Sequence, residues 1–140
     1  MNRKSDQISA IVESLRGRDL DARYLGYFEC FNQQLFFEAH EVLEELWLGE
    51  RGGARDLFYK GLIQLAGAFV HLQKERPQPA ASLLRLARSN LARFPTPQDQ
   101  LDVTGLVELI DSWLKSLEST DASARRWSLE NPPKLRLATA

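Results

Sequence analysis

The chain has 140 residues, with 18 Lys and Arg against 19 Asp and Glu, so its formal net charge is −1. This length fits one domain with its own core, and the balanced charge disfavours a general nucleic-acid binder, which would carry a basic excess. A single cysteine, Cys30, excludes an intrachain disulfide and a thiolate zinc site. Because the first residues also lack the apolar stretch of a secretory signal, we expect a cytoplasmic protein.

Apolar residues recur at helical spacing in nearly every segment, which predicts an all-α fold. A short helix is expected over residues 6–15, ended by Gly17. The next helix begins near Asp19 and ends in the turn at residues 32–34, where Asn tolerates a left-handed backbone. A further helix over residues 35–48 ends at a run of glycines.

The second half of the chain continues the same pattern. A helix over residues 55–74 stops before Pro77, which opens the next helix, and Pro95 ends that one. Residues 104–117 form the last predicted helix. The longest apolar stretch, residues 57–72, is shorter than the roughly 20 residues that a bilayer requires, so we expect no membrane span.

We therefore predict one compact bundle of about five helices. An N-terminal extension or short helix precedes it, and an extended C-terminal tail that contains prolines follows it: residues 1–18, 19–118 and 119–140, respectively.

Two ionisable side chains stand out on the predicted helix 35–48. His40 and Glu44 lie one turn apart, between the core face and the apolar pair Phe37 and Leu48. Three other acids share a separate sector that is typical of a solvated face: Glu38, Glu41 and Glu45. Since burying a carboxylate costs several kcal/mol unless it is paired, we predict a partly buried His–Glu pair with a specific role. The alternative is an ordinary hydrogen bond between neighbouring turns.

The helix over residues 55–74 carries a polar stripe on an otherwise apolar surface: Lys60, Gln64, Gly67 and His71. The short loop before it predicts antiparallel packing against helix 35–48. If the stripe faces that helix, Gln64 and His71 converge with His40 and Glu44. Two imidazoles and a carboxylate are a ligand set for zinc or ferrous iron that leaves positions for water.

The motif His-x-x-x-Glu-x-x-Trp, here His40, Glu44 and Trp47, lies within three segments: Phe31-Asn32, residues 36–47 and residues 59–66. Together they resemble the domain-of-unknown-function family 309, over roughly residues 24–94. The resemblance implies a small all-helical prokaryotic domain without an assigned activity, and a metal-binding role suggested for the motif. Gln34 departs from it, because glycine is expected at that position of the turn.

The other candidate residues each have two interpretations. Trp47 either walls the site or hydrogen-bonds Glu44, or it is a core residue at the helix end. Glu41 is a general base or part of the acidic face. Lys60 neutralises a buried carboxylate or extends to solvent. Cys30 is expected to be a small buried hydrophobe and not a nucleophile.

Charge is distributed unevenly. Residues 29–50 include acids but no Lys or Arg, whereas the predicted helix after Pro77 carries Arg85, Arg88 and Arg93 and no acid. This pattern indicates either two solvated faces or a basic face that meets an acidic partner, including a second copy.

Two functions follow from these residues. The first is a metal-binding or ligand-binding domain that uses His40 and Glu44, with Gln64 and His71 as further ligands. If that domain is an enzyme, a metal-activated water supplies the chemistry and Glu41 or Glu44 accepts the proton. The second is a non-catalytic interaction or structural module, alone or as a homo-oligomer, in which His40, Glu44 and Trp47 form a buried hydrogen-bond network. The sequence identifies no small-molecule ligand.

Overall fold

The structure, a computed structural model, describes residues 3–119 and 127–138, and side chains from Asp6 onward. Its described part contains six helices: α1 (Arg3–Ser14), α2 (Ala22–Asn32), α3 (Phe36–Leu48), α4 (Asp56–Gln73), α5 (Pro77–Leu91) and α6 (Val103–Glu118). The all-α prediction is confirmed, and the segment expected to be an extension or a short helix is the helix α1.

Side chains and backbone geometry fix the helix ends where the sequence indicates them. Asp21 caps α2 by accepting a hydrogen bond from the Arg23 N–H, and Asp102 caps α6 by accepting one from the Gly105 N–H. Pro77 begins α5, where its missing N–H costs nothing. Gln34, in the turn between α2 and α3, has a φ of +62°, in the region that favours glycine.

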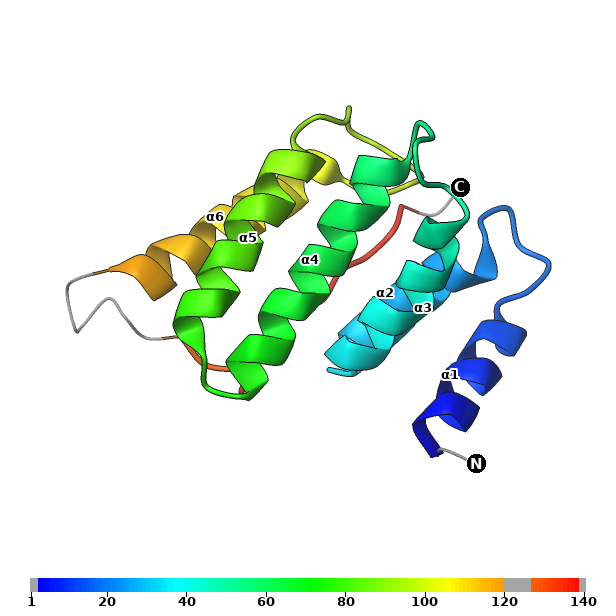
Figure 1. Cartoon of the computed structure of the whole chain (residues 1–140), viewed down its shortest axis with the longest axis horizontal. Coiled ribbons are helices and arrows are strands. Elements are labelled where there is room, and N and C mark those ends of the chain that lie inside the picture. Colours follow the sequence, from blue (N-terminus) through cyan, green and yellow to red (C-terminus); the bar gives the residue numbers. More distant parts are fainter. Residues whose placement is uncertain (1–2, 120–126, 139–140) are drawn as a thin grey trace.

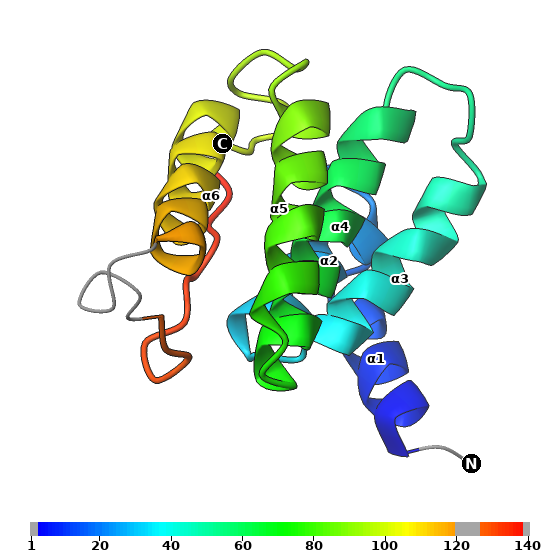
Figure 2. The same ribbon diagram turned by 60° about the vertical axis from the view of Figure 1, so that its left-hand side comes forward.

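The helices form two layers, with α4 at the centre. Helices α3, α4 and α5 are antiparallel neighbours in chain order, while α2 and α6 lie behind them (Figures 1 and 2). The Phe69 ring of α4 has its centre 5.5 Å from that of Phe31 on α2, 5.2 Å from Phe36 on α3 and 5.0 Å from Trp113 on α6. One buried ring thus joins four helices.

The α4–α5 contact is the closest in the bundle. A Cβ added to Gly61 of α4 would lie only 2.8 Å from the Leu91 Cγ of α5. The absence of a side chain at Gly61 therefore lets α5 approach the α4 backbone.

Two arginines of α5 form ion pairs with acids of the same chain. Arg85 pairs with Glu118, and Arg88 pairs with Asp111, both acids being on α6. These exposed pairs use two of the three arginines that sequence analysis considered as contacts to an acidic partner, Arg85 and Arg88.

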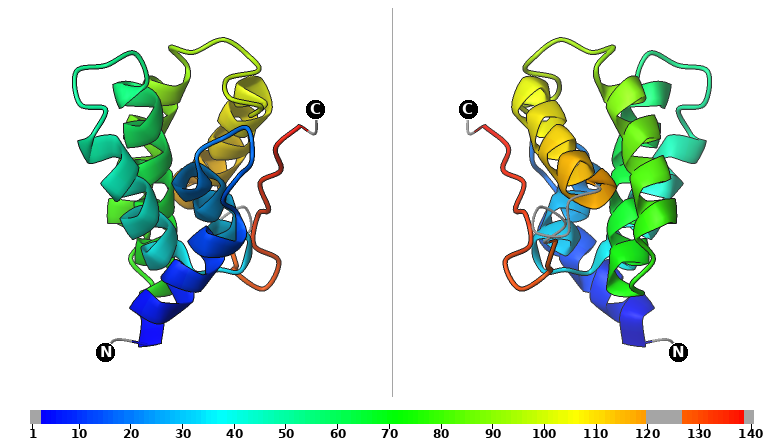
Figure 3. Two further views of the ribbon diagram at one scale, coloured as in Figure 1. Left: turned by 90° about the vertical axis from the view of Figure 1, so that its right-hand side faces the viewer. Right: turned by 90° about the vertical axis from the view of Figure 1, so that its left-hand side faces the viewer.

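The C-terminal tail is extended, as predicted. Residues 127–138 run along the α2 and α6 side of the molecule, away from α4 and α5 (Figure 3). Residues 120–126 of the predicted tail lie outside the described residues. In the described chain, no helix is both long and apolar enough to cross a membrane.

Candidate functional site

The His40–Glu44 pair forms on α3, but it lies at the surface. The His40 Nε2 is 3.2 Å from the Glu44 Oε2, and the two side chains are 31% and 44% exposed. The Phe37 ring stacks against His40, with centroids 6.1 Å apart. Both residues are partly buried, as predicted. Glu44 is the more open of the two, and the neighbouring Phe37 and Leu48 are themselves 48% and 54% exposed.

The two nitrogens of His40 have different surroundings. Nε2 faces Glu44, whereas Nδ1 is shielded from solvent and has no hydrogen-bond partner. Nε2 is thus the ring nitrogen on the Glu44 side, and Nδ1 is the one enclosed by the protein.

The polar stripe of α4 faces α5 instead of α3. The Gln64 Oε1 accepts a hydrogen bond of 2.8 Å from the Asn90 Nδ2 of α5, and a Cβ at Gly67 would meet Leu83 of the same helix. The predicted convergence of Gln64 with His40 is therefore wrong. The small residues of α4 do admit a close neighbour, as expected, but that neighbour is α5.

His71 belongs to the same stripe, at the C-terminal end of α4, and its Nδ1 is buried without a hydrogen-bond partner. Within the described residues, no group of three or more His, Cys, Asp or Glu side chains is arranged to hold a metal ion. His40, Glu44 and His71 thus do not form the three-ligand cluster that the sequence suggested, so the residues of one chain do not fit such a site.

Trp47 lies near His40 on α3 but bonds elsewhere. Its Nε1–H donates to the Asp56 Oδ1 at 2.7 Å, and the Asp56 Oδ2 accepts from the Gly52 N–H at 2.7 Å. These two bonds, first the one from Gly52 and then the one from Trp47, lower the pKa of Asp56. The predicted bond from Trp47 to Glu44 is wrong, and the buried His40–Glu44–Trp47 network is replaced by two separate pairs.

Trp47 and Asp56 therefore close the loop between α3 and α4. Sequence analysis missed Asp56, although an acid in the first turn of a helix is favoured by the helix dipole and is a signal worth following. The Arg51 guanidinium lies over the Trp47 ring, 5.7 Å from its centroid, and covers the same loop.

For Glu41, Lys60 and Cys30, the structure agrees with the simpler interpretation of each residue. Glu41 and Lys60 are exposed, the former on the outer face of α3. Cys30 has no exposed surface, and burial raises the pKa of its thiol to about 11. Cys30 is thus a buried core residue, as predicted.

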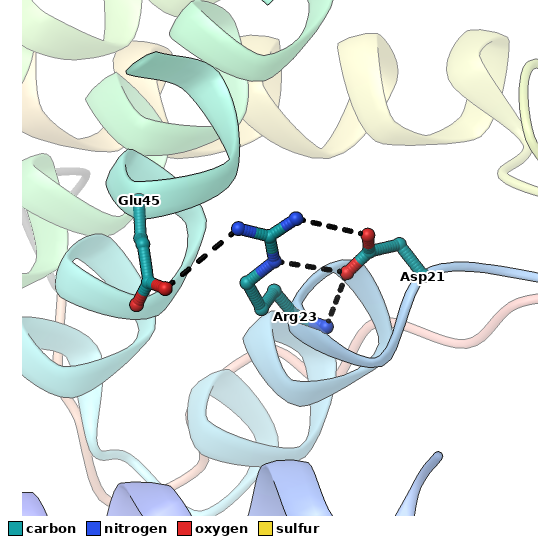
Figure 4. Close-up of polar contacts among 3 residues, drawn as sticks. All are labelled: Asp21, Arg23 and Glu45. Carbon is teal, nitrogen blue, oxygen red and sulfur yellow. Dashed lines mark hydrogen bonds and ion pairs between the residues drawn. The ribbon is translucent and has the colours of Figure 1, made fainter. Parts of the chain in front are cut away.

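A hollow that was not foreseen lies between α1, the loop after it, α2 and α3, open to solvent and with a volume of about 880 Å³. Figure 4 shows Arg23 in this region between Asp21 and Glu45, which lie 3.1 Å and 3.7 Å from its guanidinium. Hydrogen bonding to the Arg23 side chain is the main cause of the lowered pKa of Asp21. Two carboxylates therefore flank the Arg23 guanidinium at this hollow.

The fold and the motif define an all-helical domain with a surface His–Glu pair and a tryptophan-anchored loop. The family model "Domain of unknown function (DUF309)" matches residues 24–83. The resemblance seen in the sequence is confirmed over these residues, which match the model of that family.

Two relatives are themselves uncharacterised. The protein YpuF of Bacillus subtilis (strain 168) is 34% identical over 105 residues, covering 71% of this chain and 59% of YpuF. An uncharacterized protein of Aquifex aeolicus (strain VF5) is 29% identical over 126 residues, covering 89% of this chain and 35% of the relative. The chain thus spans less than two thirds of the length of either relative. No solved structure matches it significantly.

Proposed function

We propose that this chain is a non-catalytic interaction domain and that the outer face of α3 binds a partner segment that is both apolar and basic. The observation that carries the proposal is the exposure of Phe37 and Leu48, at 48% and 54%, on one face of α3. Eleven residues separate them, which places them about 20° apart around the helix and about 16.5 Å apart along it.

Carboxylates lie between these two apolar side chains. Glu41 is exposed, and Glu44 is 44% exposed beside His40. Residues 29–50 contain no Lys or Arg, so nearby cations on α3 do not cancel the charge. A complementary partner is an amphipathic helix with two apolar side chains three turns apart and Lys or Arg between them.

A direct binding experiment tests this proposal. The probe is a fluorescent 18-residue helical peptide of Leu and Lys, with its leucines on one face, titrated with the full chain. We expect saturable binding that weakens as salt rises, because exposed charges are screened. Phe37→Ala together with Leu48→Ala should reduce the affinity at least tenfold.

Leu86→Ala is the matched control, because Leu86 is an equally exposed apolar residue, at 51%, on α5. It should leave the affinity unchanged. Equal loss in both variants, or no binding by the wild-type chain, contradicts the proposal. Sedimentation of the chain alone over a range of concentrations reports whether this face instead binds a second copy.

A second candidate function is metal binding, and it is favoured by the 3.2 Å between the His40 Nε2 and the Glu44 Oε2. Two ligands bonded at about 2.0–2.2 Å to one tetrahedral ion lie about 3.3 Å apart, so this pair fits two positions of a zinc or iron site. Water or a second molecule must then supply the others.

Calorimetric titration of the full chain with Zn²⁺ tests this candidate. Stoichiometric binding that is lost in His40→Ala and kept in His71→Ala supports it, whereas an identical titration in wild type and His40→Ala contradicts it. In either case we place the chain in the cytoplasm, which agrees with its single buried thiol.

A further inference from the structure

The C-terminal tail lies on the side of the molecule away from α4 and α5 (Figure 3). The surface that it contacts there is formed by Asn32 of α2, by residues 100–101 of the turn before α6 and by α6, and we call it the groove. Its side chains alternate: Leu135 is only 5% exposed, Arg136 is exposed, and Leu137 is partly buried against the core. This is the pattern of an extended strand that inserts every second side chain.

One side chain of α2 holds the backbone of the tail. The Asn32 Nδ2 donates to the Leu135 carbonyl at 2.7 Å, and the Leu135 N–H donates to the Asn32 Oδ1 at 2.7 Å. A carboxamide that satisfies both main-chain groups of one residue recognises an extended peptide without regard to its side chain.

The turn before α6 continues this recognition. The Ala138 N–H donates to the Gln100 carbonyl at 2.7 Å, and Leu101 forms an antiparallel bridge with Leu137. The tail thus adds to the edge of this turn as a strand adds to a sheet.

The bundle and the tail together border this groove, since Lys134, Leu135 and Arg136 of the tail also line it. Beside Leu135 a hollow of about 200 Å³ is bordered by apolar residues of the turn and of α6, namely Leu101, Leu106 and Leu109. Selectivity therefore comes from two apolar positions separated by one residue, while the polar contacts are made to the main chain.

We propose that this groove is a recognition site for an extended peptide of the form Leu-x-Leu from another protein, and that the chain's own residues 134–138 occupy it as an intramolecular competitor. The tethered segment acts at a high effective concentration, so an external peptide binds weakly until the tail is displaced. This site is separate from the outer face of α3 and does not depend on the function proposed for that face.

The test uses the full-length chain and a fluorescent peptide with the sequence of residues 130–138. Leu135→Ser combined with Leu137→Ser weakens the hold on the tail and frees the groove. We expect this variant to bind the peptide saturably, at least tenfold more tightly than the wild-type chain does. Adding Asn32→Ala should weaken that binding at least tenfold, and a peptide with both leucines replaced by serine should not bind.

Several results would overturn the proposal. One is that the variant with Leu135→Ser and Leu137→Ser, the freed-groove variant, keeps its helical circular dichroism but does not bind the peptide. Another is that Asn32→Ala does not weaken the binding of the peptide to this variant. A wild-type dimer that disappears in the freed-groove variant would also overturn it, in favour of exchange of tails between two copies.

Hydrogen exchange on the wild-type chain covers the case in which the freed-groove variant does not fold. The amides of Leu135 and Ala138 should exchange well before those of α4, through local release of the tail. If they exchange only with global unfolding, the tail is a permanent part of the core and the proposal is overturned.

Discussion

Individual residues explain why the family motif was only partly interpretable. His40 and Glu44 pair on α3, yet Trp47 of the same motif turns to Asp56 and anchors a loop. Spacing within one helix predicts the first contact because its geometry is local. The second contact crosses a loop whose conformation the spacing does not determine.

The departure of Gln34 from the family pattern predicts a stability effect. Its φ of +62° is strained for a residue with a Cβ and free of that strain for glycine. Gln34→Gly should therefore raise the free energy of unfolding by about 0.5–1 kcal/mol, measured by urea denaturation.

Gln33→Gly is the control for this substitution. Gln33 has a φ of −95°, which any residue adopts, so glycine there only adds freedom to the unfolded chain. It should lower stability by about 0.5 kcal/mol. If the two variants shift stability in the same direction, the strain assigned to Gln34 is refuted.

At the scale of elements, the sequence predicts the helices better than it predicts their partners. Proline, glycine and capping residues determine where each helix begins and ends, and these signals are local. The polar stripe of α4 was assigned to the wrong neighbour because Gly61 and Gly67 indicate a close approach without saying which helix makes it. The hydrogen bond between Gln64 and Asn90 shows that α5 fills this place.

The two glycines of α4 should respond differently to alanine. At Gly61 the new Cβ would lie 2.8 Å and 3.0 Å from two atoms of Leu91, which is fully buried. We expect Gly61→Ala to lower the free energy of unfolding by about 1–3 kcal/mol, since overpacking outweighs the gain in helix propensity.

Gly67→Ala is the matched comparison on the same helix. There the nearest atom is the Leu83 Cδ1 at 3.2 Å, the end of a partly exposed side chain that can move. Stability should rise by up to about 1 kcal/mol through helix propensity. Urea titrations of both variants check the pair, and a loss at Gly67 as large as that at Gly61 would argue against close α4–α5 packing as the cause.

At the scale of the whole molecule, several side-chain hydrogen bonds between loops and helix ends lie at the same end of the bundle. Four carboxylates lie there, near the loops that follow α3 and α5 and at the start of α2 and α6 (Figure 1): Asp21, Asp56, Asp99 and Asp102. All four have a lowered pKa. For Asp99, burial acts in the opposite direction, and the hydrogen bonds from Arg55 and Gln98 outweigh it.

This arrangement predicts acid sensitivity with a definite sign. A carboxylate whose pKa is lower in the folded state stabilises the fold above its unfolded value of 3.8, and that contribution is lost as the pH falls through the folded pKa. Urea midpoints should therefore change little through these groups above about pH 5 and fall steeply below about pH 4.

Asp99→Asn is the variant that checks this assignment. It removes the titrating group that accepts from Arg55 at 2.8 Å and 3.1 Å, so the acid-induced fall should become shallower. An unchanged pH profile would mean that other carboxylates control the transition.

The reactivity of the Cys30 thiol reports how often the helical bundle opens. It is the single cysteine of the chain, it has no exposed surface, and its thiol pKa is raised to about 11 by burial. The thiolate is the nucleophile that attacks a thiol reagent, so labelling at neutral pH must wait until α2 separates from the core. The rate at which native protein is modified therefore measures how often the bundle opens, without any engineered probe.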